Sequence, residues 1–282
     1  MNELGEFLKS RRARVRPEET GLRSYGGRRR VPGLRREELA QLAGMSADYY
    51  TRLEQGRGGG VSEEVLNALA RTLGLDQDER TYLFSLARPV RAARRTRHTV
   101  GPELRHLLDA MEGVPAYVVD HRSEVLAWNH LAAALYTGLG RHRNWARFCF
   151  LDEASKEIFV DWAKKAREIV AYLRMKAAQH PDDAQLAALV GELSLKSADF
   201  RRWWADHHVR EKTRGTKQLR HPLVGELSLS FQSFTVAGES DQALVAYAAE
   251  PGSPAQEALR LLAGLRGGQG PAGRSLTYAE PR

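Results

Sequence analysis

Three polar side chains in one short stretch have the chemistry to read DNA bases. Asp48, Thr51 and Arg52 share one side of a predicted helix with the small Ala47. Arg can bond O6 and N7 of guanine together, and Asp can accept a hydrogen bond from N4 of cytosine. A helix that presents such groups near its N-terminus fits the major groove. Ala47 can at most touch a thymine methyl, so base reading would depend on the other three residues.

Two short helices joined by a tight turn would hold these side chains in place. Gly44 can take the left-handed conformation that ends a first helix, and the Ser46 hydroxyl can cap a second one. Each helix has an apolar face at helical spacing, made by Leu39, Ala40 and Ala43 in the first and by Tyr50 and Leu53 in the second. From the spacing alone, an ordinary helical hairpin in a bundle explains this pattern as well as a DNA-reading motif does.

A resemblance favours the DNA-reading interpretation. The pattern E-L-A-x-x-A-G-M-S-x-x-Y-x-x-x-L-E-Q-G, at residues 38–56, resembles the helix-turn-helix of phage-repressor-like (XRE) transcription factors. The resemblance implies base contacts by Ala47, Asp48, Thr51 and Arg52. It also places Arg35, Arg36 and Ser46 where phosphate contacts are expected.

Length and charge indicate two domains with different roles. The chain has 282 residues, which suits two domains. Residues 1–100 contain 20 Lys and Arg against 13 Asp and Glu, which leaves 23 against 22 for residues 101–282. Almost the whole net charge of +8 therefore lies in the first part. This asymmetry is typical of a nucleic-acid-binding domain joined to a neutral domain.

Residues 1–87 are predicted to form a five-helix, all-α repressor-like domain. Helices are expected over residues 2–15, over the two segments described above, over residues 62–74 and over residues 76–87. A long loop at residues 16–34 contains Arg28, Arg29 and Arg30. A basic segment of this kind can contact the phosphate backbone or enter a minor groove, and a solvated loop is the alternative.

Two segments outside the domains have little apolar patterning. Residues 88–102 are rich in Arg and are interpreted as the interdomain linker, either with added phosphate contacts or simply solvated. Residues 266–282 are rich in Gly and Pro, and we expect them to be a disordered tail.

Residues 103–265 have the pattern of an α+β domain. A helix is expected at Glu103 to Met111, followed by two strands at residues 115–120 and 124–129. Further helices are expected at residues 131–135, 156–180, 184–195 and 198–209, strands at residues 215–222, 225–236 and 243–251, and a last helix at residues 255–265. A five-stranded antiparallel sheet covered by helices, similar to PAS domains, follows from this order.

This region resembles a known ligand-binding domain. The stretches PAYVVDHRSEVLAWN, GTKQLRHPLVGELSL and YAAEPGSP resemble the MmyB-like domain that follows a helix-turn-helix in many actinobacterial regulators. The resemblance implies a cavity that takes a lipophilic, fatty-acid-like effector. Candidate lining residues and polar anchors are Trp128, Asn129, Trp162, Trp204, Arg210, His221 and Phe231, although large aromatic residues are more often plain core.

No catalytic or cofactor motif is present in the sequence. A phosphate-binding loop, a nucleophile elbow and HExxH are all missing, so an enzyme is the least favoured class. His207, His208 and His221 lack a Cys or carboxylate at ligand spacing, and we expect no metal there. The only cysteine, Cys149, sits among Phe148, Phe150 and Leu151 and is predicted to be a buried, inert thiol.

The sequence therefore leaves two main hypotheses. The first is a ligand-responsive transcription regulator, and the second is a DNA-binding regulator whose C-terminal domain only dimerises or recruits a partner. A homodimer on a palindromic operator is expected for either one, because one short helix reads few base pairs. The single cysteine, together with the lack of a signal peptide and of an apolar run of ~18 residues, predicts a cytoplasmic protein without membrane segments.

Overall fold

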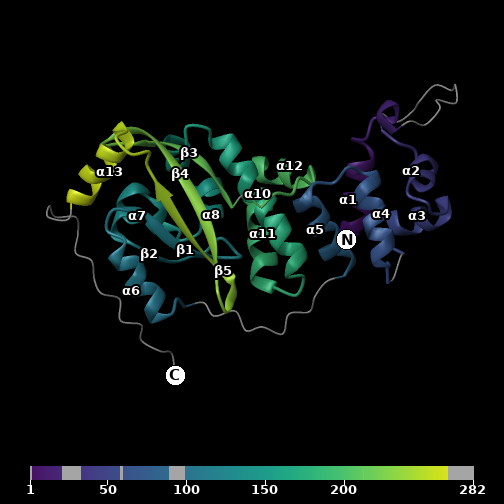
Figure 1. The fold of residues 1–282 in the computed structure, drawn as a ribbon, viewed down its shortest axis with the longest axis horizontal. Helices are drawn as coiled ribbons and strands as arrows, with labels where there is room; N and C mark the ends of the chain where they lie inside the picture. Colours follow the sequence, from purple (N-terminus) through teal and green to yellow (C-terminus); the bar gives the residue numbers. More distant parts are fainter. Residues whose placement is uncertain (1, 21–32, 58–59, 89–98, 212, 266–282) are drawn as a thin grey trace.

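A computed structural model shows a group of helices joined to a sheet with helical cover (Figure 1). The structure describes residues 2–20, 33–57, 60–88, 99–211 and 213–265. The predicted basic loop at Arg28 to Arg30, most of the predicted linker and the predicted tail lie outside these ranges.

The N-terminal domain consists of the five predicted helices. Their bounds are α1 Glu3–Arg12, α2 Arg36–Leu42, α3 Ala47–Glu54, α4 Glu63–Thr72 and α5 Gln77–Ala87, with a short 3-10 turn η1 at Pro17–Thr20. Ser46, Ser62 and Asp76 cap α3, α4 and α5 by accepting a hydrogen bond from the backbone N–H three residues later. The predicted five-helix domain is confirmed.

One apolar core holds these helices together. Phe7 of α1, Leu39 of α2, Tyr50 of α3 and Leu66 of α4 are all buried in it. The ring of Phe7 also meets Tyr82 of α5 edge-on, with the ring centroids 5.0 Å apart. Every helix of the domain thus contributes a large side chain to the same interior, which fixes the angle between α2 and α3.

The C-terminal domain is built on a five-stranded antiparallel sheet. The strands are β1 Ala116–Asp120, β2 Val125–Trp128, β3 Arg214–His221, β4 Gly225–Val236 and β5 Glu239–Ala248, in the order β2-β1-β5-β4-β3. The predicted alternation of β4 is confirmed, because Leu227, Leu229 and Phe231 are buried while Ser228 and Ser230 are exposed.

Helices cover both faces of this sheet to different extents. They are α6 Pro102–Ala110, α7 His130–Leu135, α8 Trp145–Leu151, α9 Ala154–Ile158, α10 Trp162–Gln179, α11 Ala184–Lys196, α12 Ala198–Ala205 and α13 Pro254–Gly264, with a 3-10 turn η2 at Leu139–Arg141. The inner face packs on most of them, whereas α6 lies on the outer face with Leu108 against Val118. The predicted PAS-like α+β fold is confirmed. No helix within the described ranges is long and apolar enough to cross a membrane.

Several predicted boundaries in this domain were wrong. The helix predicted over residues 156–180 is two helices, because Phe159 leaves α9 in extended conformation and bridges Leu219 at the edge of the sheet. Asp161 then caps α10 by accepting from Lys164 N at 3.0 Å. Helix α8 was not predicted, and the helix predicted from Ala198 to Val209 is shorter, because α12 ends at Ala205.

The two domains share a packed interface. Met175 and Ala178 of α10, with Val209, are buried in the same apolar cluster as the N-terminal helices. In Figure 1, α10 accordingly lies between the sheet and α5. A long helix of the C-terminal domain therefore completes the core of the N-terminal one.

A buried cation crosses this interface. The side chain of Arg174 on α10 is 2% exposed and pairs with Glu3 of α1 at 2.9 Å. Its guanidinium also donates to the Tyr82 hydroxyl at 3.4 Å and to the backbone carbonyl of Trp204, and it stacks over the Trp204 ring at 4.3 Å. Buried charges are tolerated only with such partners, so Arg174 fixes how the two domains meet.

Replacing Arg174 by Met should lower the free energy of unfolding by about 3 kcal/mol, the low end of the ~3–5 kcal/mol for breaking a buried pair, because Glu3 is partly exposed. The matched control is Arg202→Met, which removes an exposed pair with Asp199 and should cost less than ~1 kcal/mol. Urea unfolding of the full chain, followed by circular dichroism, measures both. Equal losses would contradict the structural role of Arg174.

Candidate functional site

A tight turn sets α2 and α3 at an angle. Gly44 adopts a φ of +68°, and Met45 N donates to Ala40 O at 2.9 Å, which closes the end of α2. The Ser46 hydroxyl then accepts from Tyr49 N at 3.1 Å and starts α3. The turn predicted from Gly44 and Ser46 is thus present.

The outer face of α3 carries the residues predicted to read bases. The side chains of Asp48 and Arg52 are 82% and 55% exposed, and Arg52 Nε lies 3.5 Å from Asp48 Oδ2. Thr51 is half-buried and donates its hydroxyl proton to Ala47 O at 2.8 Å. Ala47, Asp48, Thr51 and Arg52 lie on one face of α3. The ion pair keeps the guanidinium of Arg52 beside the Asp48 carboxylate.

The inner face of α3 is anchored by a carboxylate that the sequence analysis missed. Glu54 is buried and accepts from Arg12 Nη2 at 2.7 Å and from the Tyr50 hydroxyl at 3.3 Å. Its other oxygen pairs with Arg36 of α2. One carboxylate therefore ties α1, α2 and α3 together, and burial raises the pKa of Tyr50 so that its hydroxyl remains a donor.

The residues predicted to contact phosphate differ in how far their side chains are used by contacts within the domain. Arg35 is exposed at the N-terminus of α2, where its backbone N–H donates to Glu38 Oε2 at 2.7 Å. Arg36 is half exposed and pairs with Glu54, so part of its function is to position α3. Ser46 is exposed, and its hydroxyl is used as the cap described above. Arg28 to Arg30 lie outside the described residues.

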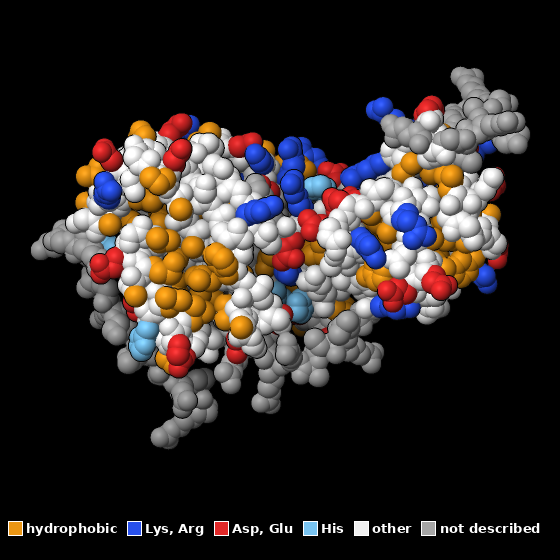
Figure 2. All heavy atoms as spheres, viewed as in Figure 1, with side chains coloured by type: hydrophobic (Ala, Val, Ile, Leu, Met, Phe, Trp, Pro, Cys, Tyr) orange, Lys and Arg blue, Asp and Glu red, His pale blue; other side chains and the backbone are white. Residues whose placement is uncertain are grey.

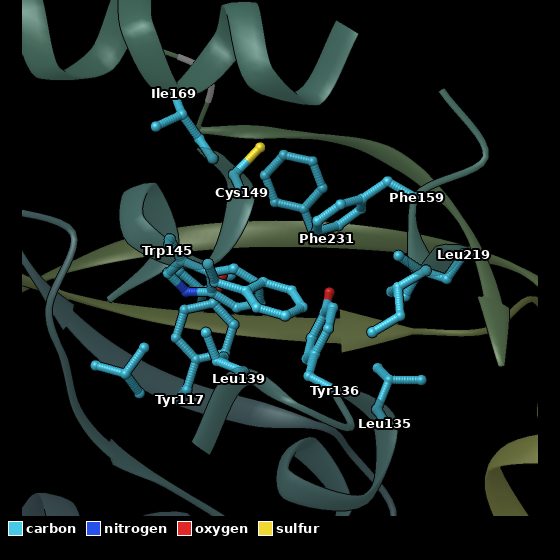
Figure 3. Packing of buried hydrophobic residues seen from close by; sticks show 14 of the residues in the cluster. Tyr117, Leu135, Tyr136, Leu139, Trp145, Cys149, Phe159, Ile169, Leu219 and Phe231 are labelled. Atoms are coloured by element: carbon cyan, nitrogen blue, oxygen red, sulfur yellow. The ribbon is translucent and has the colours of Figure 1, made fainter. Parts of the chain in front are cut away.

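A cavity of about 180 Å³ lies between α10 and the inner face of the sheet. Its apolar walls come from β1, α8, α10, β4 and β5, and include Tyr117, Trp145, Ile169, Phe231, Val245 and Tyr247. Figure 3 shows the labelled side chains of Tyr117 and Trp145 side by side within the core, with ring centroids 5.3 Å apart. Aromatic rings therefore form part of the cavity wall, beside aliphatic, polar and charged side chains.

Charged groups lie around the same cavity. Lys217 pairs with Glu168, and its ammonium lies 5.1 Å from the centre of the Phe231 ring. Lys165 Nζ lies 5.3 Å from the centre of the Trp145 ring. Lys176 pairs with Glu211 at 2.7 Å. Ammonium groups above aromatic rings are favourable. Because Glu168 and Glu211 also line the cavity, its wall carries charges of both signs.

Of the residues predicted to bind a ligand, only Phe231 lines this cavity. The Asn129 side chain caps α7 and donates to Met111 O and Val114 O, and His221 Nε2 lies 3.0 Å from Ala134 O. Trp162 Nε1 donates to Cys149 O at 3.0 Å, and Arg210 is exposed. The other two predicted residues, Trp128 and Trp204, stack with Arg143 and Arg174. Asn129, His221 and Trp162 thus contact the backbone, and Trp128 and Trp204 stack on arginines, so these five side chains have structural contacts away from the cavity.

Three further titratable side chains, Cys149, His207 and His180, lie outside the polar contacts described above. Burial raises the pKa of Cys149 to about 12, so the predicted burial of this thiol is confirmed and the thiol stays protonated at neutral pH. His207 Nδ1 lies 3.1 Å from Arg174 Nη1, so that ring belongs to the domain interface. Burial, with His121 beside it, lowers the pKa of His180.

Comparison with family models agrees with this geometry. Residues 100–262 match the MmyB-like transcription regulator ligand binding domain, and residues 3–83 match a helix-turn-helix domain. No curated protein matched the chain. The chain therefore belongs to the family of DNA-binding helix-turn-helix transcription regulators that carry an MmyB-like ligand-binding domain.

Proposed function

We propose that a lipophilic, fatty-acid-like effector binds between α10 and the sheet and thereby sets the affinity of this regulator for DNA. One observation carries the proposal. With Ile169 and Tyr172, α10 lines the cavity, and with Met175 and Ala178 the same helix packs into the core of the N-terminal domain. A single rigid element thus borders both the effector space and the DNA reader.

The cavity walls suit an amphiphile with a carboxylate. Rings such as Tyr117 and Tyr247 can cover an acyl chain, while the ammonium groups of Lys165 and Lys217 can attract a negative head. Burial raises the pKa of Tyr117 and Tyr247 well above the usual value, which keeps both phenols neutral beside an apolar chain.

The size of the cavity suggests how the signal is transmitted. Its volume of about 180 Å³ is smaller than the ~300–1,000 Å³ of typical small-molecule pockets. A long acyl chain must therefore displace a wall, and the hydrogen-bonded sheet is stiffer than its helical cover. Displacement of α10 would act directly on α5, and Glu211 adds a second route because its backbone N–H donates to Asp78 Oδ2 at 3.1 Å.

At the DNA, we propose a cytoplasmic homodimer on a palindromic operator, with half-sites about one helical turn, ~34 Å, apart. Base reading is assigned to Asp48, Thr51 and Arg52, with Ala47 at a thymine methyl. Arg35, Arg36 and Ser46 are assigned to the backbone, together with Arg28 to Arg30. A monomer at micromolar concentration with an asymmetric footprint would contradict this assignment.

A purely dimerising C-terminal domain is the second candidate. Leu107 of α6 and Phe234 of β4 are each 52% exposed, and Figure 2 shows hydrophobic side chains gathered over the C-terminal domain. Exposed apolar patches are typical of protein interfaces. In this alternative, DNA affinity depends on dimerisation and is independent of any effector.

Arg52→Ala should relax base preference at one position in each half-site and cost about 1–3 kcal/mol of binding free energy, because a bidentate base contact is lost. Arg35→Ala should instead weaken binding to all sequences alike and flatten the salt dependence, since each lost phosphate contact lowers the slope of log K against log salt by ~0.9. Titration of operator and random DNA at several salt concentrations separates the two effects. Equal losses on both DNAs for both variants would show that α3 does not read bases.

Val245→Phe should abolish the response to added fatty acid, because the larger ring fills the cavity from β5. In the unmodified protein, stripped of lipophilic guests, fatty acids should change operator affinity by roughly 5–150-fold, with larger effects for longer chains. The control is Leu244→Phe, since Leu244 is the next residue of β5 and packs on the other face of the sheet. Unchanged operator affinity at every chain length would favour the dimerising alternative.

A further inference from the structure

Three groups that can bind a metal ion come together at the edge of the cavity. One ring nitrogen of His121, one of His180 and a carboxylate oxygen of Asp241 lie within 4.8 Å of one another. His121 directly follows β1, His180 ends α10, and Asp241 lies in β5. Among the residues that the structure describes, no other set of three His, Cys, Asp or Glu side chains is arranged in this way.

The hydrogen bonds of His121 leave one nitrogen for a ligand. Nε2 lies 2.7 Å from Asp183 Oδ2, and Asp183 is ion-paired with Arg122 at 2.7 Å. An ionised carboxylate only accepts, so Nε2 carries the ring proton. In the neutral ring Nδ1 therefore has the lone pair, and this atom is buried without a hydrogen-bond partner in a residue that is 2% exposed. A buried acceptor left unpaired in this way is costly.

This arrangement is the one found around metal-binding histidines. Such rings donate their other N–H to a carboxylate, which fixes the tautomer and the orientation of the ring. Asp183 is itself held by Arg122 and by the backbone N–H groups of Gln185 and Leu186 at the start of α11. The orientation of the His121 imidazole is thus fixed, with Nδ1 as its remaining nitrogen, and the ring of His180 stacks on it with the ring centroids 4.2 Å apart.

We propose that His121, His180 and Asp241 bind a divalent transition-metal ion of the Zn²⁺ class. Two imidazoles and one carboxylate match the ligand preference of this ion, whereas Mg²⁺ and Ca²⁺ prefer oxygen ligands alone. Metal–ligand bonds of about 2.0–2.2 Å place ligand atoms roughly 3.3 Å apart, so modest side-chain rotations close the site. The fourth position faces the cavity, because His121 and Asp241 line it.

A metal ion here would fasten the C-terminal end of α10 to two strands of the sheet. Met175 and Ala178, within the last two turns of α10, pack on the N-terminal domain. Binding would therefore restrain the same helix through which the two domains meet. Metal binding by these three side chains is independent of the identity of any effector.

Full-length protein treated with chelator and then titrated with ZnCl₂ should bind one equivalent. Its Tm should rise by about 5–10 °C at a free metal concentration ~100-fold above Kd, since the folded site binds the ion and the unfolded chain does not. CoCl₂ should give the visible absorption of a tetrahedral site with nitrogen and oxygen ligands. A Tm that does not respond to either ion, without stoichiometric binding, would overturn the proposal.

Variants locate the site. His180→Gln and Asp241→Asn should each lower Zn²⁺ affinity by more than about 100-fold, and Asp183→Asn, which keeps a helix cap, by about 10–100-fold. The matched control is His142→Gln, which removes another His–carboxylate pair, at 3.2 Å from Asp152, and should leave affinity unchanged. Stoichiometric binding retained in both His180→Gln and Asp241→Asn would place the ion elsewhere.

Replacing one metal-binding side chain by another distinguishes loss of a ligand from loss of folding. His180→Cys should keep stoichiometric binding and add a thiolate charge-transfer band to the Co²⁺ spectrum, because the thiolate replaces the imidazole as ligand. A folded His180→Cys protein that binds Co²⁺ without this band would also overturn the assignment of His180.

Discussion

The buried guanidinium of Arg174 is the interaction on which the arrangement of this protein depends. A cation removed from water must be surrounded by acceptors, and here they come from both domains, Glu3 and Tyr82 on one side and the Trp204 carbonyl on the other. A change in the angle between the domains would leave that charge unpaired. The electrostatic cost of separation therefore makes the two domains move together.

The helix α10 that carries Arg174 connects the ligand-binding domain directly to the helix-turn-helix domain. Ile169 and Tyr172 face the cavity, while Met175 and Ala178 face the N-terminal core about one turn further along α10. Protein interiors are packed about as densely as organic crystals. A displacement of α10 must therefore also move the residues that pack against it. Coupling through a shared rigid element needs only a few ångströms of movement.

Within the helix-turn-helix domain, the buried carboxylate of Glu54 holds helices together in the way that Arg174 holds the two domains together. Arg12 and Arg36 meet its carboxylate from two other helices, so the face of α3 with Asp48 and Arg52 is held at a fixed angle to α2. Arg36 was predicted to contact phosphate only, since its pairing with Glu54 joins positions 18 residues apart. Helical spacing relates neighbours three or four apart and contains no information about such a pair.

The sequence by itself determined the features that depend on local pattern. The caps at Ser46 and Ser62, the turn at Gly44 and the alternation of β4 follow from hydrogen bonding and side-chain periodicity within a few residues. It also determined that Asp48, Thr51 and Arg52 share the outer face of α3, because those side chains lie on one helix. The strands, the five N-terminal helices and the α+β fold class were therefore predictable.

Only the tertiary structure decided which distant residues meet. Phe231 was predicted at the cavity, whereas Asn129 and His221 turned out to satisfy backbone groups, because burial obliges each polar side chain to use the nearest donor or acceptor. His121 and Asp241 are 120 residues apart and meet only because β1 pairs with β5. Their contact depends on strand register, which no local pattern in the sequence specifies.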